Sequence, residues 1–84
     1  VAVIHASNVT GVLQDAAHIA RIIRDRSDNR ALFLLDAAQS LGHVPISVRD
    51  ADVDLLAMPG HKGLLGPTGT GALYIRPGVE RAML

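Results

Sequence analysis

The sequence contains no cysteine and no tryptophan, and it has only one phenylalanine and one tyrosine. Without cysteine, this chain can form neither a disulfide nor a thiolate metal site. The formal net charge is zero and the basic residues are dispersed, so no basic surface indicates binding to nucleic acid or to an anionic membrane. No apolar run approaches the roughly 20 residues that span a bilayer. We therefore expect a soluble, cytoplasmic protein whose partners are neither nucleic acids nor membranes.

Aliphatic residues take the place of aromatic ones in this sequence. Hydrophobic residues make up 49% of the chain, and nearly all of them are Ala, Val, Ile and Leu. This composition is typical of a parallel sheet covered by helices. The sequence opens directly on a strand pattern and ends on "VERAML", which is typical of a helix start. We therefore expect residues 1–84 to be one part of a larger domain, truncated at both ends.

Hydrophobic periodicity predicts strands that alternate with a helix. Residues 1–4 predict a buried strand that ends at His5, and Asp15 predicts the N-cap of a helix that runs to about Arg26. Further strands are predicted at 31–35, 54–58 and 71–76. This order predicts an α/β fold in which the first two strands are parallel and joined by a right-handed crossover.

Polar residues follow three of the predicted strands. Ligands of α/β sheets bind at the carboxyl ends of strands, so these residues are the first candidates for a site. The first strand end offers His5, Ser7 and Asn8, the second offers Asp36 and Gln39, and the third offers His61 and Lys62.

Asp36 has two interpretations when it is considered alone. A carboxylate that directly follows five apolar residues loses hydration unless a cation or several donors meet it. Aspartate is also a favoured N-cap, and the chain could turn helical at "AAQSLG". Both interpretations stay open at this point.

Lys62 also has two interpretations. A lysine in a loop is ordinarily a surface residue, but Gly60, Gly63 and Gly66 indicate close backbone approach, either to a ligand or at a tight crossing. A lysine in a confined site can lose its proton and form a Schiff base with an aldehyde.

Nucleotide and metal motifs fit the sequence poorly. In "GPTGTG" the glycines follow Lys62, whereas a P-loop places its lysine after them, and Tyr74 occupies the third glycine position of a dinucleotide fingerprint. The four histidines lack a metal-ligand spacing, so we expect no metal site. Pyridoxal 5'-phosphate, in contrast, would use all three strand ends, because it offers an aldehyde, a ring nitrogen, a ring oxygen and a phosphate.

Three stretches, "HASNVTG", "DAAQSLGHVPISV" and "GHKGLLGPTGTGALYIR", resemble the class V aminotransferase family of fold-type I pyridoxal phosphate enzymes. Within that family they are most similar to the cysteine desulfurase branch. The resemblance covers nearly the whole chain. It implies that residues 1–84 are part of the cofactor-binding large domain, whose mostly parallel sheet is flanked by helices, and that 71–76 is the antiparallel member. It also implies a homodimer with the active site near its interface.

The resemblance implies a role for each candidate residue. Lys62 would be the catalytic lysine that holds the cofactor as a Schiff base, and Asp36 would pair with the pyridinium nitrogen. Gln39 would hydrogen-bond the phenolic oxygen of the ring, and His61 would help to hold the phosphate. Asn8 would lie near the ring oxygen and the substrate carboxylate, with His5 and Ser7 positioning its loop. One residue departs from the pattern, because many relatives carry Ser or Thr where this chain has Pro59, so one phosphate contact is lost or replaced.

The implied reaction removes sulfur from L-cysteine to leave L-alanine, with a sulfur acceptor protein as partner. The alternatives are a transaminase, a selenocysteine lyase or another member of the family, or a non-catalytic relative. The cysteine that would separate these reactions lies outside the 84 residues. We expect the isolated segment to be inactive.

Overall fold

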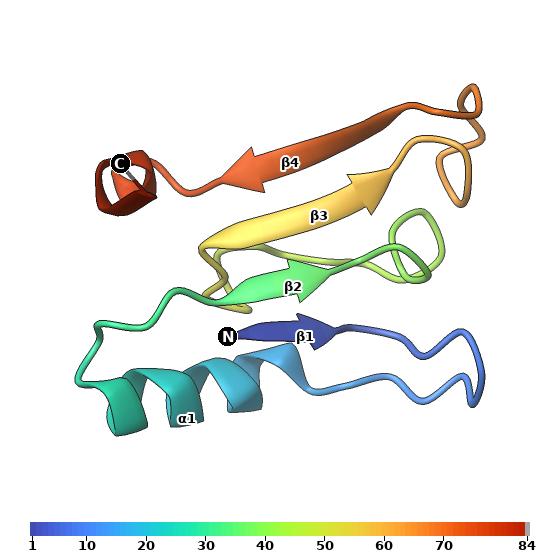
Figure 1. Cartoon of the computed structure of the whole chain (residues 1–84). Helices are drawn as coiled ribbons and strands as arrows, with labels where there is room; N and C mark the ends of the chain where they lie inside the picture. Colours follow the sequence, from blue (N-terminus) through green and yellow to red (C-terminus); the bar gives the residue numbers. More distant parts are fainter. Residues whose placement is uncertain (84) are drawn as a thin grey trace.

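The computed structural model describes residues 1–83, which form one four-stranded sheet in the order β1, β2, β3, β4 (Figure 1). Strands β1 (Ala2–Ile4), β2 (Leu34–Asp36) and β3 (Leu55–Pro59) are parallel neighbours, and β4 (Gly71–Ile75) runs antiparallel to β3. Helix α1 (Ala16–Ser27) joins β1 to β2, and the 3-10 helix η1 (Val79–Met83) follows β4. The predicted α/β class, the parallel first pair and the antiparallel last strand are confirmed.

Helix α1 begins and ends at residues whose backbone and side chains suit those positions. Asp15 is the N-cap, and its side chain accepts a hydrogen bond of 3.0 Å from the backbone N–H of His18. The helix ends before Asp28, which has a left-handed backbone with φ of 54°. The predicted cap is confirmed, and the helix runs one residue past Arg26. Neither helix in residues 1–83 combines the length and apolar character that crossing a bilayer requires.

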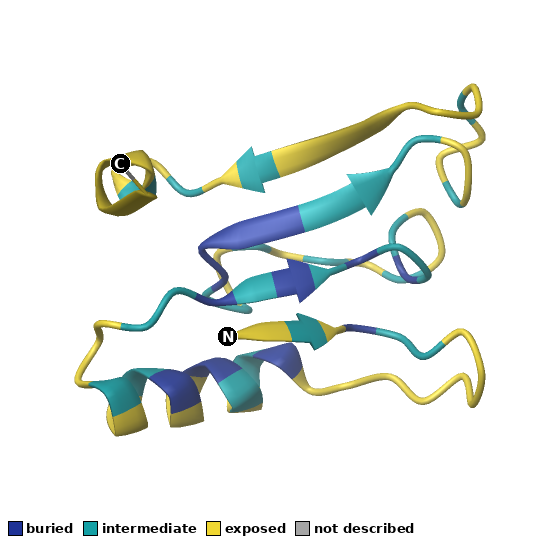
Figure 2. Cartoon of the chain, in the orientation of Figure 1, coloured by how far each residue is buried: buried dark blue, intermediate teal, exposed yellow. Residues whose placement is uncertain are grey.

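One face of the sheet carries the hydrophobic core. Strand alternation places Phe33 and Leu35 on the same face, and both are fully buried. Helix α1 covers this face with Ala16, Ala20 and Ile23, and Figure 2 shows the buried positions of the helix turned toward the sheet. The segment between β2 and β3 completes the cover with partly buried apolar residues, namely Leu41, Ile46, Val48 and Ala51.

The opposite face of the sheet is largely uncovered by residues 1–83. Ile4, Asp36, Ala57 and Leu73 are register partners across the four strands, so they share this face. Ile4 is 55% exposed and Leu73 is 50% exposed. The prediction that the first strand is buried is therefore wrong for this chain, because β1 lies at the sheet edge and only its other face meets α1.

Four charged residues tie the helix to the amino-terminal end of β3. Arg24 contacts Asp52 at 3.0 Å and Asp54 at 2.9 Å, and Arg76 contacts the same two carboxylates at 2.6 and 3.4 Å. Burial alone would raise the pKa of Asp52, but hydrogen bonds from Arg76 and Arg24 outweigh it and hold that pKa below its usual value. Burial likewise opposes the charge of Arg24, but hydrogen bonds to Asp52 and Asp54 raise the pKa of Arg24.

Candidate active site

Three connecting segments meet at the carboxyl edge of the parallel strands. Because β1, β2 and β3 point the same way, the residues that follow each strand lie at one end of the sheet. In Figure 1 the loops after these strands gather on the side to which the arrows point. All the polar residues predicted from the sequence lie on this edge.

Asn8 lies on the first of these segments, where it is exposed in a turn. The turn is held by Ser7, whose Oγ accepts hydrogen bonds from the N–H groups of Val9 at 3.2 Å and Thr10 at 3.1 Å. The backbone of Ser7 also accepts from Gly11 at 3.0 Å. Ser7 therefore organises the loop that presents Asn8, as the resemblance implies.

Asp36 is the last residue of β2, half-buried between Ile4 and Ala57 on the face opposite α1. Its Oδ1 accepts a hydrogen bond of 2.9 Å from the N–H of Ala38. The capping interpretation is thus right in part, although Asp36 caps a series of turns at 38–43 and not a helix. Within residues 1–83, Oδ2 has no hydrogen-bond partner and is available to a cation or a donor.

The turn that carries Gln39 touches the loop that carries Lys62. Gln39 is half-buried, and three residues on, Gly42 lies against the backbone of Gly63. A Cβ added at Gly42 would be 2.5 Å from the carbonyl oxygen of Gly63, and one added at Gly63 would collide with the carbonyl oxygen of Leu41. Only glycine allows this approach, so the residue after Lys62 is fixed against the turn of Gln39.

His61 and Lys62 are both exposed, and Lys62 is the one lysine of the sequence. Their loop is held by its own backbone, since Leu65 N donates to Lys62 O at 2.9 Å and Gly66 N donates to Gly60 O at 2.6 Å. Of the two interpretations of the glycines, the structure shows the tight crossing. In residues 1–83 no carboxylate pairs with the Lys62 ammonium.

Pro59 is the final residue of β3 and pairs with Gly71 of β4. It is half-buried, and it has neither a hydroxyl nor an N–H to offer to an anion. The donors that remain at this strand end belong to the loop from Gly60 onward.

His5 was expected to position the loop of Asn8, but its side chain points to another segment. His5 Nδ1 lies 2.8 Å from Ser40 Oγ, and both residues are buried. Burial lowers the pKa of the His5 imidazole. The backbone of His5 does support its own loop, because its carbonyl accepts from Gln14 N at 2.8 Å. Sequence reasoning missed Ser40, although a serine directly between the candidate residue Gln39 and the apolar Leu41 is a signal for a hydroxyl that needs a partner if the turn is buried.

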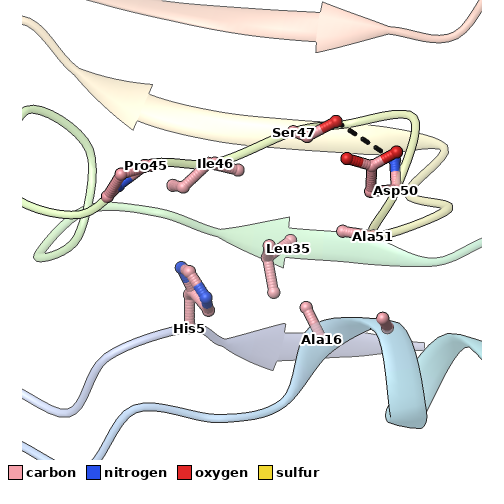
Figure 3. Close-up of a pocket in the computed structure, with 9 residues that line it drawn as sticks. His5, Ala16, Leu35, Pro45, Ile46, Ser47, Asp50 and Ala51 are labelled. Atoms are coloured by element: carbon pink, nitrogen blue, oxygen red, sulfur yellow. Dashed lines mark hydrogen bonds between the residues drawn. The ribbon is translucent and has the colours of Figure 1, made fainter.

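His5 also lines a mostly apolar pocket of about 200 Å³ between α1 and the segment at 45–51. Figure 3 shows the His5 ring at one end of this pocket and Asp50 with Ala51 at the other.

The family model for "Aminotransferase class-V" matches residues 1–84. The chain belongs to this family. The chain is 50% identical over 80 residues to a probable cysteine desulfurase of Methanothermobacter thermautotrophicus. The aligned part covers 95% of this chain and 19% of that relative. It is 49% identical over 75 residues to the cysteine desulfurase IscS of Histophilus somni. Here the aligned part covers 89% of this chain and 18% of that relative. This class V chain therefore spans about a fifth of the length of the curated relatives it matches.

The class V fold is also seen in the solved structures. The apo structure of the cysteine desulfurase from Thermococcus onnurineus NA1 superimposes with a TM-score of 0.82 at 46% identity, over 90% of this chain and 18% of that one. The mixed sheet of this chain is thus a segment of the sheet of the fold-type I pyridoxal phosphate enzymes. Members of the class V family are pyridoxal 5'-phosphate enzymes, so the expected cofactor is that of the family.

The residues of this edge fit that cofactor chemically. Within residues 1–83, Asp36 Oδ2 has no partner and suits a protonated ring nitrogen, the Gln39 amide is a donor that suits the ring oxygen, and the exposed amine of Lys62 is of the chemical type that forms a Schiff base with an aldehyde. The edge therefore contains one side chain suited to the ring nitrogen, one to the ring oxygen and one to the aldehyde.

Proposed function

We propose that these residues form the core of a pyridoxal phosphate site that removes sulfur from L-cysteine and leaves L-alanine. The observation that carries the proposal is the contact between Gly42 and Gly63. It joins the turn of Gln39 to the loop of Lys62, at the same edge of the sheet as Asp36 at the end of β2. The relatives named cysteine desulfurase, at 46 to 50% identity, favour this reaction over the others of the family.

The bound cofactor supplies an electron sink for the carbanion formed at the substrate Cα. Lys62 Nζ would hold the cofactor through its aldehyde, and the same amine would move the Cα proton of the substrate. Asp36 keeps the ring nitrogen protonated, because an adjacent carboxylate stabilises the cationic form. Gln39 donates to the ring oxygen. Asn8 binds near that oxygen and the substrate carboxylate, and His61 binds the phosphate.

The remaining parts of the proposal concern the whole protein. Residues 1–84 would be part of the large, cofactor-binding domain, and the protein would act as a homodimer that passes sulfur to an acceptor protein. A cytoplasmic location also remains a prediction. The term "full-length protein" below means a protein that contains this sequence and is as long as the relatives.

Product analysis of the full-length protein tests the reaction. The protein is loaded with pyridoxal phosphate and given L-cysteine without a keto acid. Alanine together with protein-bound or released sulfur supports the proposal. Amino transfer that requires an added keto acid, with no alanine from cysteine alone, would replace the desulfurase by a transaminase.

Reduction with borohydride tests Lys62 separately from the reaction. Borohydride makes the bond between the cofactor and its lysine permanent, and peptide mapping then locates the modified residue. We expect the adduct on Lys62 and its loss in Lys62→Ala. An adduct on a lysine outside residues 1–84 would remove this edge from the active site.

A further inference from the structure

His5 and Ser40 connect two segments of the site that are far apart in sequence. Their side chains are 2.8 Å apart, with 7% of His5 and 1% of Ser40 exposed. His5 directly follows β1 and precedes the loop of Asn8, whereas Ser40 directly follows Gln39. The bond therefore spans the ends of the two neighbouring parallel strands β1 and β2.

The surroundings of Ser40 favour one direction for this hydrogen bond. Among residues 1–83, the Ser40 hydroxyl has no partner other than His5. If His5 Nδ1 carried a proton and donated it, the buried hydroxyl hydrogen would be left without an acceptor, which is unfavourable. Ser40 is thus the donor, and Nδ1 of a neutral imidazole is the acceptor. The imidazole proton is then on Nε2, the nitrogen that is not bonded to Ser40.

We propose that His5 and Ser40 are positioning residues for the cofactor site, and that their hydrogen bond holds the turn of Gln39 in place at the strand ends. This inference rests on the proposed function. Neither side chain is placed against the cofactor, so the pair acts only through the residues that it orients.

Backbone contacts extend from this pair toward three of the proposed cofactor residues, namely Asp36, Gln39 and Lys62. The N–H of His5 donates to the carbonyl of Asp36 at 2.9 Å. The carbonyl of Ser40 accepts from Val44 N at 2.8 Å and from His43 N at 3.0 Å, which closes the turn around Gly42. Gly42 in turn packs against Gly63, the residue after Lys62. A loosened Ser40 would therefore shift Gln39 and remove support from the Lys62 loop.

The test compares two serine-to-alanine variants of the full-length protein. Ser40→Ala removes the donor to His5. Ser27→Ala is the matched control, because Ser27 also makes side-chain hydrogen bonds, to Ile23 O at 2.6 Å and from Ala31 N at 3.1 Å, but lies at the end of α1 far from the carboxyl edge. A second pair is His5→Leu, which removes the acceptor, and His5→Asn, whose amide can place an oxygen near the position of Nδ1.

Cofactor affinity and thermal stability are measured for each variant. Cofactor affinity is measured by titrating the apo-protein with pyridoxal phosphate and recording its visible absorption, and thermal unfolding of the apo-protein reports any general loss of stability. In addition, the 15N chemical shift of the His5 ring in the apo-protein reports whether Nδ1 accepts a hydrogen bond.

We expect Ser40→Ala and His5→Leu to weaken cofactor binding by about tenfold, the effect of one buried hydrogen bond. Ser27→Ala should bind as the wild type does, and His5→Asn should recover part of the affinity. Equal affinity of Ser40→Ala and Ser27→Ala, with the wild type binding normally, would overturn the positioning role and leave the proposed function standing. A wild type that binds no cofactor would overturn the proposed function and this inference with it.

Discussion

Gly42 and Gly63 lie in backbone contact, and through them the turn after β2 touches the loop after β3. The two glycines differ in what they contribute. Gly42 also has φ of +87°, which side chains other than glycine rarely adopt, whereas Gly63 is confined by the carbonyl oxygen of Leu41. The contact fixes the distance between the segments of Gln39 and Lys62, so a side chain at either position would separate them.

Gly42→Ala should therefore lower both stability and cofactor affinity. The positive φ alone costs about 1 to 2 kcal/mol for a residue with a Cβ, and the new Cβ would also collide with Gly63. Gly69→Ala is the matched control, because Gly69 has φ of +86° with nothing within 4 Å of an added Cβ. We expect both variants to lose stability, but only Gly42→Ala to bind pyridoxal phosphate more weakly in a titration. Equal affinity of the two variants would show that the contact does not support the site.

Asp36→Asn should abolish most turnover while it keeps the fold. Asparagine retains an oxygen that can accept from Ala38 N, but it carries no charge to keep the ring nitrogen protonated. Loss of one such electrostatic group costs on the order of 100-fold in turnover. Alanine formation from L-cysteine is the measurement, and Asp25→Asn on the exposed side of α1 is the control. Turnover close to that of the wild type would reject the role of Asp36.

Asp54→Ala should destabilise the protein strongly. The side chain of Asp54 is 5% exposed, and besides its ion pairs it accepts a hydrogen bond of 2.7 Å from the backbone of Phe33. Removing one member of a buried charged cluster costs about 3 to 5 kcal/mol, because its partners are left unpaired. Asp25→Ala should change the free energy of unfolding by no more than about 0.5 kcal/mol. Denaturant unfolding compares the two variants, and a loss for Asp54→Ala as small as that of the control would contradict the expectation.

Much of the fold follows from local sequence signals. Asp15 caps α1 because its side chain reaches His18 N, and the apolar run "ALFLL" correctly predicts a strand that includes Leu34 and Leu35 of β2. The exposure of Ile4 could not be predicted, because an apolar strand pattern does not tell which residues cover the second face of its sheet. The strand bounds also differ from the predicted ones: β3 was predicted at 54–58 and runs from Leu55 to Pro59, and β2 was predicted from residue 31 and begins at Leu34.

The candidate site was predicted less completely than the fold. Parallel strands made it clear that Asp36 and Lys62 belong to one edge, since carboxyl ends of such strands coincide. The contact of Gly42 with Gly63 and the bond of His5 to Ser40 join residues that are 21 and 35 positions apart. No spacing rule connects residues at such separations when the loops between them are irregular. The roles of Asn8, Gln39 and His61 toward the cofactor remain predictions.

His5 should make stability depend on pH in the weakly acidic range. Burial lowers the pKa of its imidazole in the folded state below the ordinary value of 6.5. Below pH 6.5 the unfolded chain then binds more protons than the folded one, so the free energy of unfolding falls as the pH falls. This contribution is complete above pH 6.5 and is lost as the pH approaches the folded-state pKa.

The full-length wild type should thus lose more stability between about pH 7.5 and about pH 5 than His5→Leu, by up to about 1.4 kcal/mol per pH unit for one proton. Denaturant unfolding at each pH gives the slope of the free energy of unfolding against pH. The slopes of the two proteins are compared, and not their free energies, because His5→Leu also leaves Ser40 without its partner and so lowers stability at every pH. His18→Gln is a control, since His18 is exposed. Asp50→Asn is a second control, because Asp50 lines the same pocket as His5, and it should keep the wild-type slope. A wild-type slope in His5→Leu would mean that the folded protein protonates His5 as readily as the unfolded chain does. The neutral acceptor required by the bond from Ser40 would then be lost as soon as the pH falls through the ordinary value of 6.5.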